Sequence, residues 1–559
     1  MRNVNVVIVG AGPTGLTAAL ELARHGIAST LLDRLPGPSE EDVGSRAIAI
    51  HRSALEVWER IGCAAPMLAE GVAWRTRRTF LGDREILTQE LPAPRHGLPT
   101  FLNLQQYRTE RHLRAAVAGT PAVEVLSGHE VTAVRQDRRG VTLDVTTSAG
   151  TRTFRAAYVL ACDGARSSVR RALGLDFPGR SFPDRFLIAD VRADLGLPPE
   201  PRFYFDHPAH PGSTLLVHPQ PFGVWRVDWQ LGSDADIAAE TAPARMDERI
   251  RTLIRSLTGE DRPHELIWLS DYRFHQRLLT RLRHRRVFFL GDAGHLVAPF
   301  GARGMNGAIL DVENLAWKLA AVLRGQAGEG LLESYQDERW AAQEHNRRVV
   351  DATMRFMAPR TRWQQLRRGG VQRLAARLRF AARWVDSGRM SEPFRYRTGA
   401  LVADAEPARR WRGAPPVGAK APDGRFRLAG QTVDLRDLLG RDVVALHFAA
   451  DAPAARAYAA RAGDLPRCTV LSLAPEDAGD LADRYAAAPG TLYVLRPDGH
   501  VAARRRDAGP DAVRTLLRMI LKVGLVELGA DLPQQRSHVG GDVDEAETGV
   551  DARERGPGA

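Results

Sequence analysis

A glycine-rich stretch near the start of the chain, Gly10-Ala11-Gly12-Pro13-Thr14-Gly15, has the residue types and spacing of a phosphate-binding turn. It follows a short apolar, β-branched run and leads into a segment with apolar residues at helical spacing. In this pattern Gly10 permits the tight bend, Gly12 lets the backbone approach a pyrophosphate, and Gly15 lets helix and strand pack closely. The helix N-terminus adds unpaired N–H groups that attract an anion. The pattern predicts a dinucleotide site.

An acid follows at the offset expected for a ribose contact. A second strand, over 28–32, ends in Asp33, and Arg34 comes next. A carboxylate about 20 residues after the glycine turn binds ribose hydroxyls in dinucleotide folds. We therefore count Asp33 and Arg34 among the residues that contact the nucleotide.

Two later strands also end in turns that combine glycine with an acid. A strand over 157–161 leads to Cys162-Asp163-Gly164, and a strand over 287–290 leads to Gly291-Asp292. The second turn continues into a glycine-rich loop, 299–307, and a helix expected over 308–323. Ligands of open α/β sheets bind at the carboxyl edge of the strands, where such turns lie. We expect all three turns to border one groove.

These turns need a parallel sheet to position them, whereas residues 180–275 predict an antiparallel sheet that could roof a pocket. Aromatic and polar residues alternate there over 182–191, 202–206, 213–218 and 224–231. Within the last strand both tryptophans and Val227 face one side, while Arg226 and Asp228 face the other. That polar side is either an exposed cross-strand ion pair or a surface that meets the substrate.

The composition limits the class of protein. The chain has 559 residues and a formal net charge of +11, but its basic residues are spread along the whole length and only three of the 78 are lysines. This distribution argues against nucleic-acid binding. The sequence shows neither a membrane-spanning run nor a secretory signal, and its three cysteines are too far apart for a disulfide framework or a metal pair. We expect a cytoplasmic protein without a metal site.

The order of the elements predicts an α/β fold in which two domains interleave. A Rossmann-like cofactor-binding domain is expected over 1–180 and 276–400, and an antiparallel substrate domain over 72–104 and 181–275. A small α/β domain follows over 401–525, where strands alternate with helical segments. The last residues, 526–559, are polar and rich in glycine and aspartate, which predicts a disordered tail.

In this combination and order, the three turns resemble those of the group A FAD-dependent aromatic hydroxylases. Within that family, the sequence is most similar to the branch of phenol, 3-(3-hydroxyphenyl)propionate and aromatic polyketide hydroxylases. The resemblance covers roughly 3–400 and extends to about 525 in the tail domain. Two positions depart from the family pattern: Asp33 stands where glutamate is usual, and Gly294 replaces an alanine.

The resemblance implies roles for individual residues. Asp33 would hold the adenosine ribose, Arg46 and Gln106 would contact FAD phosphate or ribityl groups, and Asp292 would bind the ribityl hydroxyls. Asp163 and Gly164 match a motif associated with both FAD and the nicotinamide cofactor. The loop under the isoalloxazine ring would comprise Pro299, Gly304, Met305 and Asn306.

The resemblance also implies the reaction. NADPH or NADH would dock transiently and reduce FAD, O2 would then give a flavin C4a-hydroperoxide, and a phenolic or polyketide aromatic substrate would be hydroxylated. The reaction needs a dry pocket, and a base or proton relay would activate the phenol. His218, Arg226 and Asp228 are the candidates for that relay or for substrate binding.

The C-terminal domain resembles the thioredoxin-like tail of these hydroxylases. After its strand at 443–448 the sequence reads Ala449-Ala450-Asp451-Ala452-Pro453, without Cys-x-x-Cys, so it cannot run dithiol exchange. We interpret it as structural or dimer-forming, which leaves a homodimer open.

Other functions remain open at this point. A flavin enzyme of polyketide tailoring could instead carry out Baeyer–Villiger insertion or epoxidation, and a flavin-bound redox sensor would need no catalysis. A flavin halogenase would share the first turn but needs a W-x-W-x-I-P motif, which this chain lacks.

Overall fold

The computed structural model describes residues 2–37, 46–94, 97–357, 392–397 and 406–521, with isolated positions between 363 and 401. By contact density the chain divides into Met1–Val523 and Gly524–Ala559. The disordered tail that we predict over 526–559 lies outside the described residues. No helix in the described part is long and apolar enough to cross a membrane.

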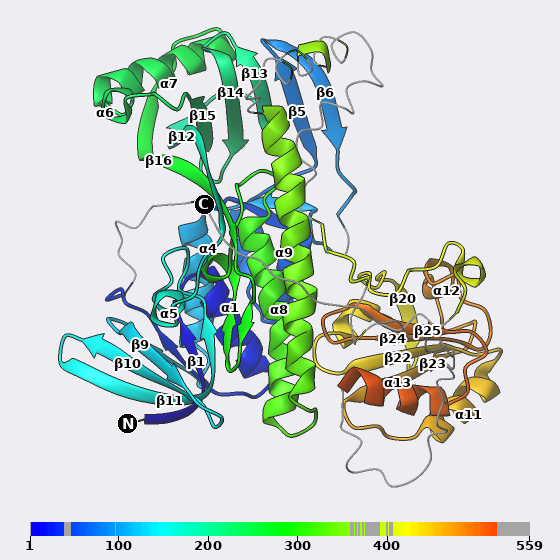
Figure 1. Cartoon of the computed structure of the whole chain (residues 1–559). Helices are drawn as coiled ribbons and strands as arrows, with labels where there is room; N and C mark the ends of the chain where they lie inside the picture. Colours follow the sequence, from blue (N-terminus) through cyan, green and yellow to red (C-terminus); the bar gives the residue numbers. More distant parts are fainter. Residues whose placement is uncertain are drawn as a thin grey trace, which may run out of the picture. The chain divides into compact units, whose positions relative to one another are not determined.

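The first sheet is built around strand β1 (Arg2–Val9) (Figure 1). Its parallel core has the order β18-β11-β1-β2-β8. Antiparallel strands extend it on the side away from β8, where β17 pairs with β18 and β10 pairs with β11. Residues 6–9 of β1 are buried because helices or strands cover both faces, which explains their unbroken apolar run. The other strands are β2 (Ser29–Leu32), β8 (Val123–Leu126), β9 (Glu130–Gln136), β10 (Val141–Thr147), β11 (Gly150–Ala161), β17 (Arg283–His284) and β18 (Val287–Phe289).

Several helices pack against this sheet and against one another. Helix α1 (Pro13–Arg24) contacts both α4 (Gln106–Ala118) and α8 (Gly304–Leu323), and α8 runs beside α9 (Gly330–Met357), as Figure 1 shows. A short helix, α5 (Ser168–Ala172), follows β11. Helix α8 is buried on nearly all sides, and it begins at Gly304 rather than at residue 308 as we predict from the sequence.

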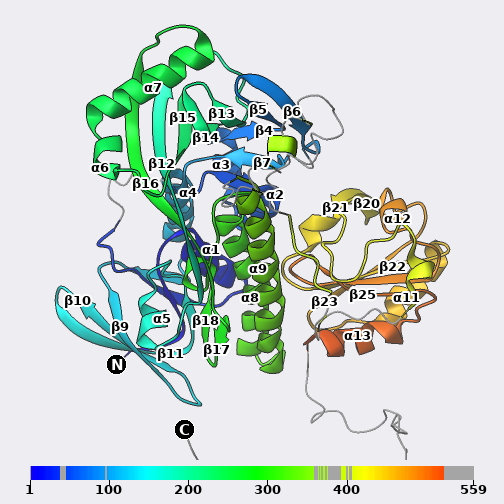
Figure 2. The ribbon, with the colours of Figure 1, turned by 45° about the horizontal axis from the view of Figure 1, so that its top comes forward.

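The second sheet is mostly antiparallel, with the strand order β19-β16-β12-β15-β14-β13-β5-β6. Helices α6 (Ile237–Glu240) and α7 (Pro243–Thr258) accompany it, and α7 lies across one of its faces (Figures 1 and 2). That face is apolar because Trp225, Val227 and Trp229 pack against α7 residues there. The strands are β5 (Thr76–Leu81), β6 (Arg84–Glu90), β12 (Gly179–Ala193), β13 (Arg202–His207), β14 (His210–Pro219), β15 (Val224–Leu231), β16 (His264–Leu278) and β19 (His295–Leu296).

A third sheet has three strands, which come from separate parts of the sequence between residues 49 and 103. Strand β7 (Phe101–Asn103) pairs with both β3 (Ala49–His51) and β4 (Val72–Trp74). Helices α2 (Arg52–Arg60) and α3 (Ala64–Glu70) follow β3. The interval 72–104 is therefore shared, since β5 and β6 join the second sheet while β4 and β7 belong to the third.

The C-terminal segment has its own four-stranded sheet, in the order β23-β22-β24-β25. Its strands β22 (Val443–Phe448), β23 (Cys468–Leu473) and β24 (Thr491–Leu495) have the bounds that the sequence predicts. A thioredoxin-like identity for this segment stays a prediction. Its other elements are η3 (Ala408–Trp411), β20 (Arg425–Leu428), β21 (Gln431–Asp434), η4 (Leu435–Leu438), α11 (Ala452–Ala462), α12 (Leu481–Arg484), β25 (Val501–Arg505) and α13 (Asp511–Leu521).

Close packing between β1 and α1 depends on glycine. A Cβ atom added to Gly15 would lie 1.9 Å from the carbonyl oxygen of Gly10, so no side chain fits there. We predict that Gly15→Ala forces α1 away from the sheet and destabilises the fold by about 3 kcal/mol, the upper range for overpacking. Thermal unfolding followed by circular dichroism checks this. An unchanged melting temperature would contradict the packing described here.

Candidate active site

A cavity of about 390 Å³ lies between the turns of the first sheet and the polar face of the second. Most of the predicted site residues line it. They are Gly12, Pro13, Thr14, Arg46, Gln106, Gly164, His218, Arg226, Asp228, Asp292, Pro299, Gly304, Met305 and Asn306. Gly10, Gly15, Asp33, Arg34, Asp163 and Gly291 are absent from its lining. The three predicted turns therefore border one space, although not with every residue named from the sequence.

The three turns pack directly against one another at glycines. A Cβ on Gly10 would come within 2.5 Å of the Cys162 carbonyl oxygen, and Gly10 has a φ of +103°. A Cβ on Gly291 would lie 2.9 Å from both the Thr14 hydroxyl and the Ala308 methyl. These contacts bring the start of α1, the end of β11 and the start of α8 to one edge of the cavity.

Asp163 and Asp33 do not line the cavity, and each binds backbone or neighbouring side chains through one carboxylate oxygen. Asp163 Oδ2 accepts hydrogen bonds from the Ser168 hydroxyl and the Val169 N–H, each at 3.1 Å, so it binds the first turn of α5, whose N-cap is Ser167. Its Oδ1 is buried with no partner among the described residues. Asp33 Oδ2 accepts from the Ala11 N–H at 2.5 Å, which holds the glycine turn to the end of β2. Arg34 beside it is exposed.

The helix α8 N-terminus forms one wall of the cavity. Because α8 starts at Gly304, its first-turn residues 304–306 present backbone N–H groups there. The Asn306 side chain faces the protein: its Oδ1 accepts from the His51 N–H at 2.8 Å, and its Nδ2 donates to the Ala49 carbonyl at 2.9 Å. Asn306 thus ties α8 to strand β3, and its amide nitrogen is already engaged with two backbone carbonyls.

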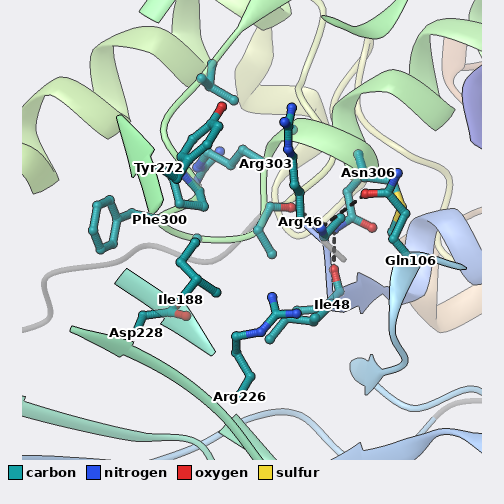
Figure 3. Close-up of a pocket in the computed structure, with 18 of the residues that line it drawn as sticks. Arg46, Ile48, Gln106, Ile188, Arg226, Asp228, Tyr272, Phe300, Arg303 and Asn306 are labelled. Carbon is teal, nitrogen blue, oxygen red and sulfur yellow. Dashed lines mark hydrogen bonds between the residues drawn. The ribbon is translucent and has the colours of Figure 1, made fainter. Parts of the chain in front are cut away.

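Charged groups gather at the same end of the cavity. Burial raises the pKa of Asp292, although His295 and Arg46 oppose the shift. The Arg46 guanidinium lies 5.4 Å from the centre of the Tyr272 ring (Figure 3). Burial, together with Asp292, raises the pKa of Tyr272. This end can therefore accept both a polyhydroxylated chain and an anionic group.

The other end of the cavity is lined by aromatic and aliphatic side chains of the second sheet and of the loop before α8. Phe186 and Phe274 stack with ring centres 4.4 Å apart, and Phe300 meets both rings edge-on. Ile188 and Leu216 complete the apolar lining. Such a surface suits a flat aromatic ring and excludes water.

Within this apolar end, Arg226 is already paired. Its Nε and a terminal nitrogen donate to both carboxylate oxygens of Asp190, at 2.5 and 2.9 Å, and both residues are buried. The partners face each other across strands β12 and β15. The alternation predicted for 225–229 is confirmed, but the alternative of an exposed ion pair is wrong because the pair lies inside the protein.

Asp228 and His218 differ from Arg226 because neither carries a compensated charge. Burial raises the pKa of Asp228 to about 7, against the attraction of Arg226. Its Oδ1 has no hydrogen-bond partner among the described residues. Burial also lowers the pKa of His218 to about 3, with Arg226 adding to the shift. At neutral pH, His218 is therefore neutral and Asp228 is poised between its two forms.

Sequence reasoning missed Tyr272, Asp190 and the aromatic group at the apolar end. Asp190 lies in a predicted strand, but its partner is 36 residues away and follows from strand pairing alone. Tyr272 belongs to β16, whose 15 residues alternate too weakly in sequence to show which side faces the cavity. Strand register, the missing information, is a tertiary property.

Residues 3–353 match the family model of an FAD binding domain. The chain is 31% identical over 414 residues to a 3-(3-hydroxy-phenyl)propionate/3-hydroxycinnamic acid hydroxylase of Mycobacterium sp. (strain JLS), covering 73% of this chain and 69% of the relative. It is 31% identical over 545 residues to a 6-methylpretetramide 4-monooxygenase of Streptomyces rimosus, covering 92% and 93%. The solved structure of the flavin-dependent monooxygenase PieE with FAD and substrate has a TM-score of 0.77 and 25% identity, covering 93% and 99%.

The residues present fit FAD. A Cβ on Gly12 would meet no described heavy atom within 4 Å, so the backbone there is open to a phosphate group. The α8 N-terminus, Arg46 and Asp292 supply the donors and the acceptor that a flavin with a ribityl chain requires. The cofactor is therefore FAD.

We predict that Gly12→Ala weakens FAD binding while leaving the fold intact. Gly12 has φ −78° and ψ −177°, which alanine adopts without strain, and the added methyl enters the space in front of the turn. The FAD dissociation constant should rise about tenfold or more, because the methyl blocks close approach of the pyrophosphate. Flavin fluorescence titration measures this. Equal melting temperatures for the FAD-free Gly12→Ala and wild-type proteins serve as the control, and unchanged affinity would contradict the assignment.

Proposed function

The chain belongs to the FAD-dependent aromatic hydroxylases, and we propose that it hydroxylates a phenolic or polyketide aromatic substrate with NAD(P)H and O2 as co-substrates. One observation carries the proposal. A single cavity has a polar end shaped by three glycine turns and an apolar end where one carboxylate, Asp228, has a pKa of about 7. The substrate ring would lie against Phe186 and Phe274.

The cofactor would be held by the residues at the polar end. The turn at Gly12 and the α1 N-terminus would bind the pyrophosphate, and Asp33 the adenosine ribose. Arg46, Gln106 and Asp292 would bind phosphate and ribityl groups, next to the α8 backbone at 304–306. When bound and reduced, FAD supplies the activated oxygen for the reaction.

Asp228 would act on the substrate as a proton acceptor. A phenol attacks more readily after losing its proton, and a carboxylate with a pKa near the working pH is an effective base. The pair formed by Arg226 and Asp190 would lie beside the ring as a neutral unit, because its charges compensate each other. His218, which is neutral, would provide a hydrogen bond to the ring substituents without taking up a proton.

The second sheet would keep water away from the reacting atoms. Its cavity side carries Phe186 and Phe274, which pack against Phe300 of the loop before α8, and its opposite side is covered by α7. An activated oxygen species is wasted when water reaches it, so a dry cavity couples cofactor oxidation to product formation. NAD(P)H would reach the flavin transiently, because the sequence has no second G-x-G-x-x-G turn to hold it.

The C-terminal segment, 401–525, would be a thioredoxin-like domain without redox chemistry. Cys468 is its lone cysteine in the sequence, so it holds no dithiol. Its part would be structural. In the same proposal, the cofactor-binding domain spans 1–180 and 276–400, and the substrate domain spans 72–104 and 181–275.

Substrate-stimulated NAD(P)H consumption tests the function. We expect a yellow protein that oxidises NADPH or NADH faster with a hydroxylated aromatic compound or polyketide, and a product that is one oxygen heavier with its rings intact. Mass spectrometry and a ring-opening assay separate hydroxylation from Baeyer–Villiger insertion. Purification without flavin, together with no uptake of added FAD, would overturn the proposal.

The role of Asp228 predicts a pH dependence. Asp228 is protonated below about pH 7 and charged above it, so kcat/KM should rise through that pH and then level off. Asp228→Asn should lower kcat/KM by about 100-fold at pH 8, the lower range for losing a general base, and abolish the inflection. Steady-state kinetics between pH 5.5 and 8.5, a range of about one to two units around the pKa, measure both effects.

His218→Asn is the matched control, because it alters a neighbouring cavity residue whose pKa of about 3 cannot produce the inflection. The inflection should persist in this variant. If it also persisted in Asp228→Asn, Asp228 would not be the base.

A further inference from the structure

A network of buried polar and charged side chains connects the wall of the cofactor cavity to the C-terminal segment. It runs from Asp311 in α8 through Arg339 in α9 to Tyr396, and from there to Arg496 and Asp498 near β24 and β25. These side chains are at most 2% exposed. Nothing in the chemistry proposed above uses them.

At one end, this network fixes the Gly291-Asp292 turn through Asp311. Asp311 Oδ2 accepts a hydrogen bond from the Gly291 N–H at 3.1 Å and lies 2.6 Å from Nε2 of His295. Its Oδ1 accepts from Arg339 Nε at 2.7 Å. Although burial raises the pKa of Asp311, His295 and Arg339 hold it at about 2, so the carboxylate is charged at working pH.

Arg339 extends the network to the start of α8, which forms one wall of the cavity. One terminal nitrogen donates to the Gly307 carbonyl at 3.1 Å, in the first turns of α8, and the other to the Tyr396 hydroxyl at 3.0 Å. One guanidinium therefore joins the acid that holds the Gly291-Asp292 turn, the beginning of α8, and a tyrosine from beyond α9. A planar fork of donors is suited to this task.

Tyr396 is held in turn by the C-terminal segment. The Arg496 guanidinium lies 5.4 Å from the centre of the Tyr396 ring, and the His500 ring is 4.5 Å away. Arg496 is itself fixed between Asp498 and Glu338, and Glu338 also binds Lys318 at 2.8 Å. The position of the tyrosine hydroxyl thus depends on residues of both the helices and the C-terminal sheet.

A stabilising role alone explains this arrangement poorly. Buried ion pairs are often no more stable than apolar packing of the same volume, and their best attested benefit is to fix one geometry. Here the geometry that is fixed belongs to the two backbone segments that border the cavity, Gly291-Asp292 and the first turns of α8.

We propose that Asp311, Arg339 and Tyr396 are positioning residues for FAD, and that the C-terminal segment completes the cofactor site by locking Tyr396. This rests on the proposed placement of FAD beside the Gly291-Asp292 turn. The three residues act on the cofactor through the backbone that they hold.

The rate at which the full-length holoenzyme releases FAD tests the proposal. Tyr396→Phe keeps the ring but removes the hydroxyl that meets Arg339, so release measured by flavin fluorescence after dilution should become about tenfold faster, the effect of one charge-assisted hydrogen bond. The visible absorption band of the bound flavin should shift as well. Arg339→Lys keeps the positive charge and loses the fork, and should accelerate release further.

The matched control is Tyr485→Phe, which also removes a buried tyrosine hydroxyl. That hydroxyl donates to the Pro422 carbonyl, at a distance of 2.8 Å, and neither residue lines the cofactor cavity. It should release FAD within about twofold of wild type even if it melts as early as Tyr396→Phe. Wild-type release rates and spectra in both Tyr396→Phe and Arg339→Lys would overturn the inference, as would equally fast release from Tyr485→Phe. Absence of FAD from the wild-type chain would instead overturn the proposed function.

Discussion

The site depends on backbone segments that touch without side chains between them. Gly15 allows α1 to reach the Gly10 carbonyl, Gly10 allows the first turn to reach Cys162, and Gly291 allows the third turn to reach Thr14. Each contact occurs where a Cβ would collide. Because the glycines interlock the ends of three strands, the N-termini of α1 and α8 are brought to one edge of the sheet, where their N–H groups can act on the same cofactor.

On the opposite side of the cavity, the important constraint is the cost of burying charge. Arg226 is tolerated inside the second sheet because Asp190 neutralises it through two hydrogen bonds. Asp228 has no such partner among the described residues, and its raised pKa is the consequence. Arg226 and Asp228 lie two positions apart on β15. The substrate end therefore has both a polar group whose charge is compensated and an acid that titrates.

Much of the architecture could be predicted from local patterns. Strand bounds in the C-terminal segment, the faces of residues 225–229, and the meeting of the three turns follow from periodicity and glycine spacing. Prediction failed where distant packing decides. The two glycines at 304 and 307 suggest a loop, yet burial of α8 extends the helix through them. Asp163 is absent from the cavity lining and binds the first turn of α5, so its role toward the cofactor stays a prediction. Tyr396 could not be linked to Arg339 because they are 57 residues apart.

The strict alternation of β15 has a consequence for how relatives of this enzyme can diverge. Inserting or deleting one residue in that strand would turn its tryptophans into the cavity and its charged residues toward α7. New substrate preferences are therefore accessible through exchanges of side chains at the inward positions, at constant strand length. Changes of length in the connecting loops leave this register intact, so they can alter the rim of the cavity without exchanging the two faces of the strand.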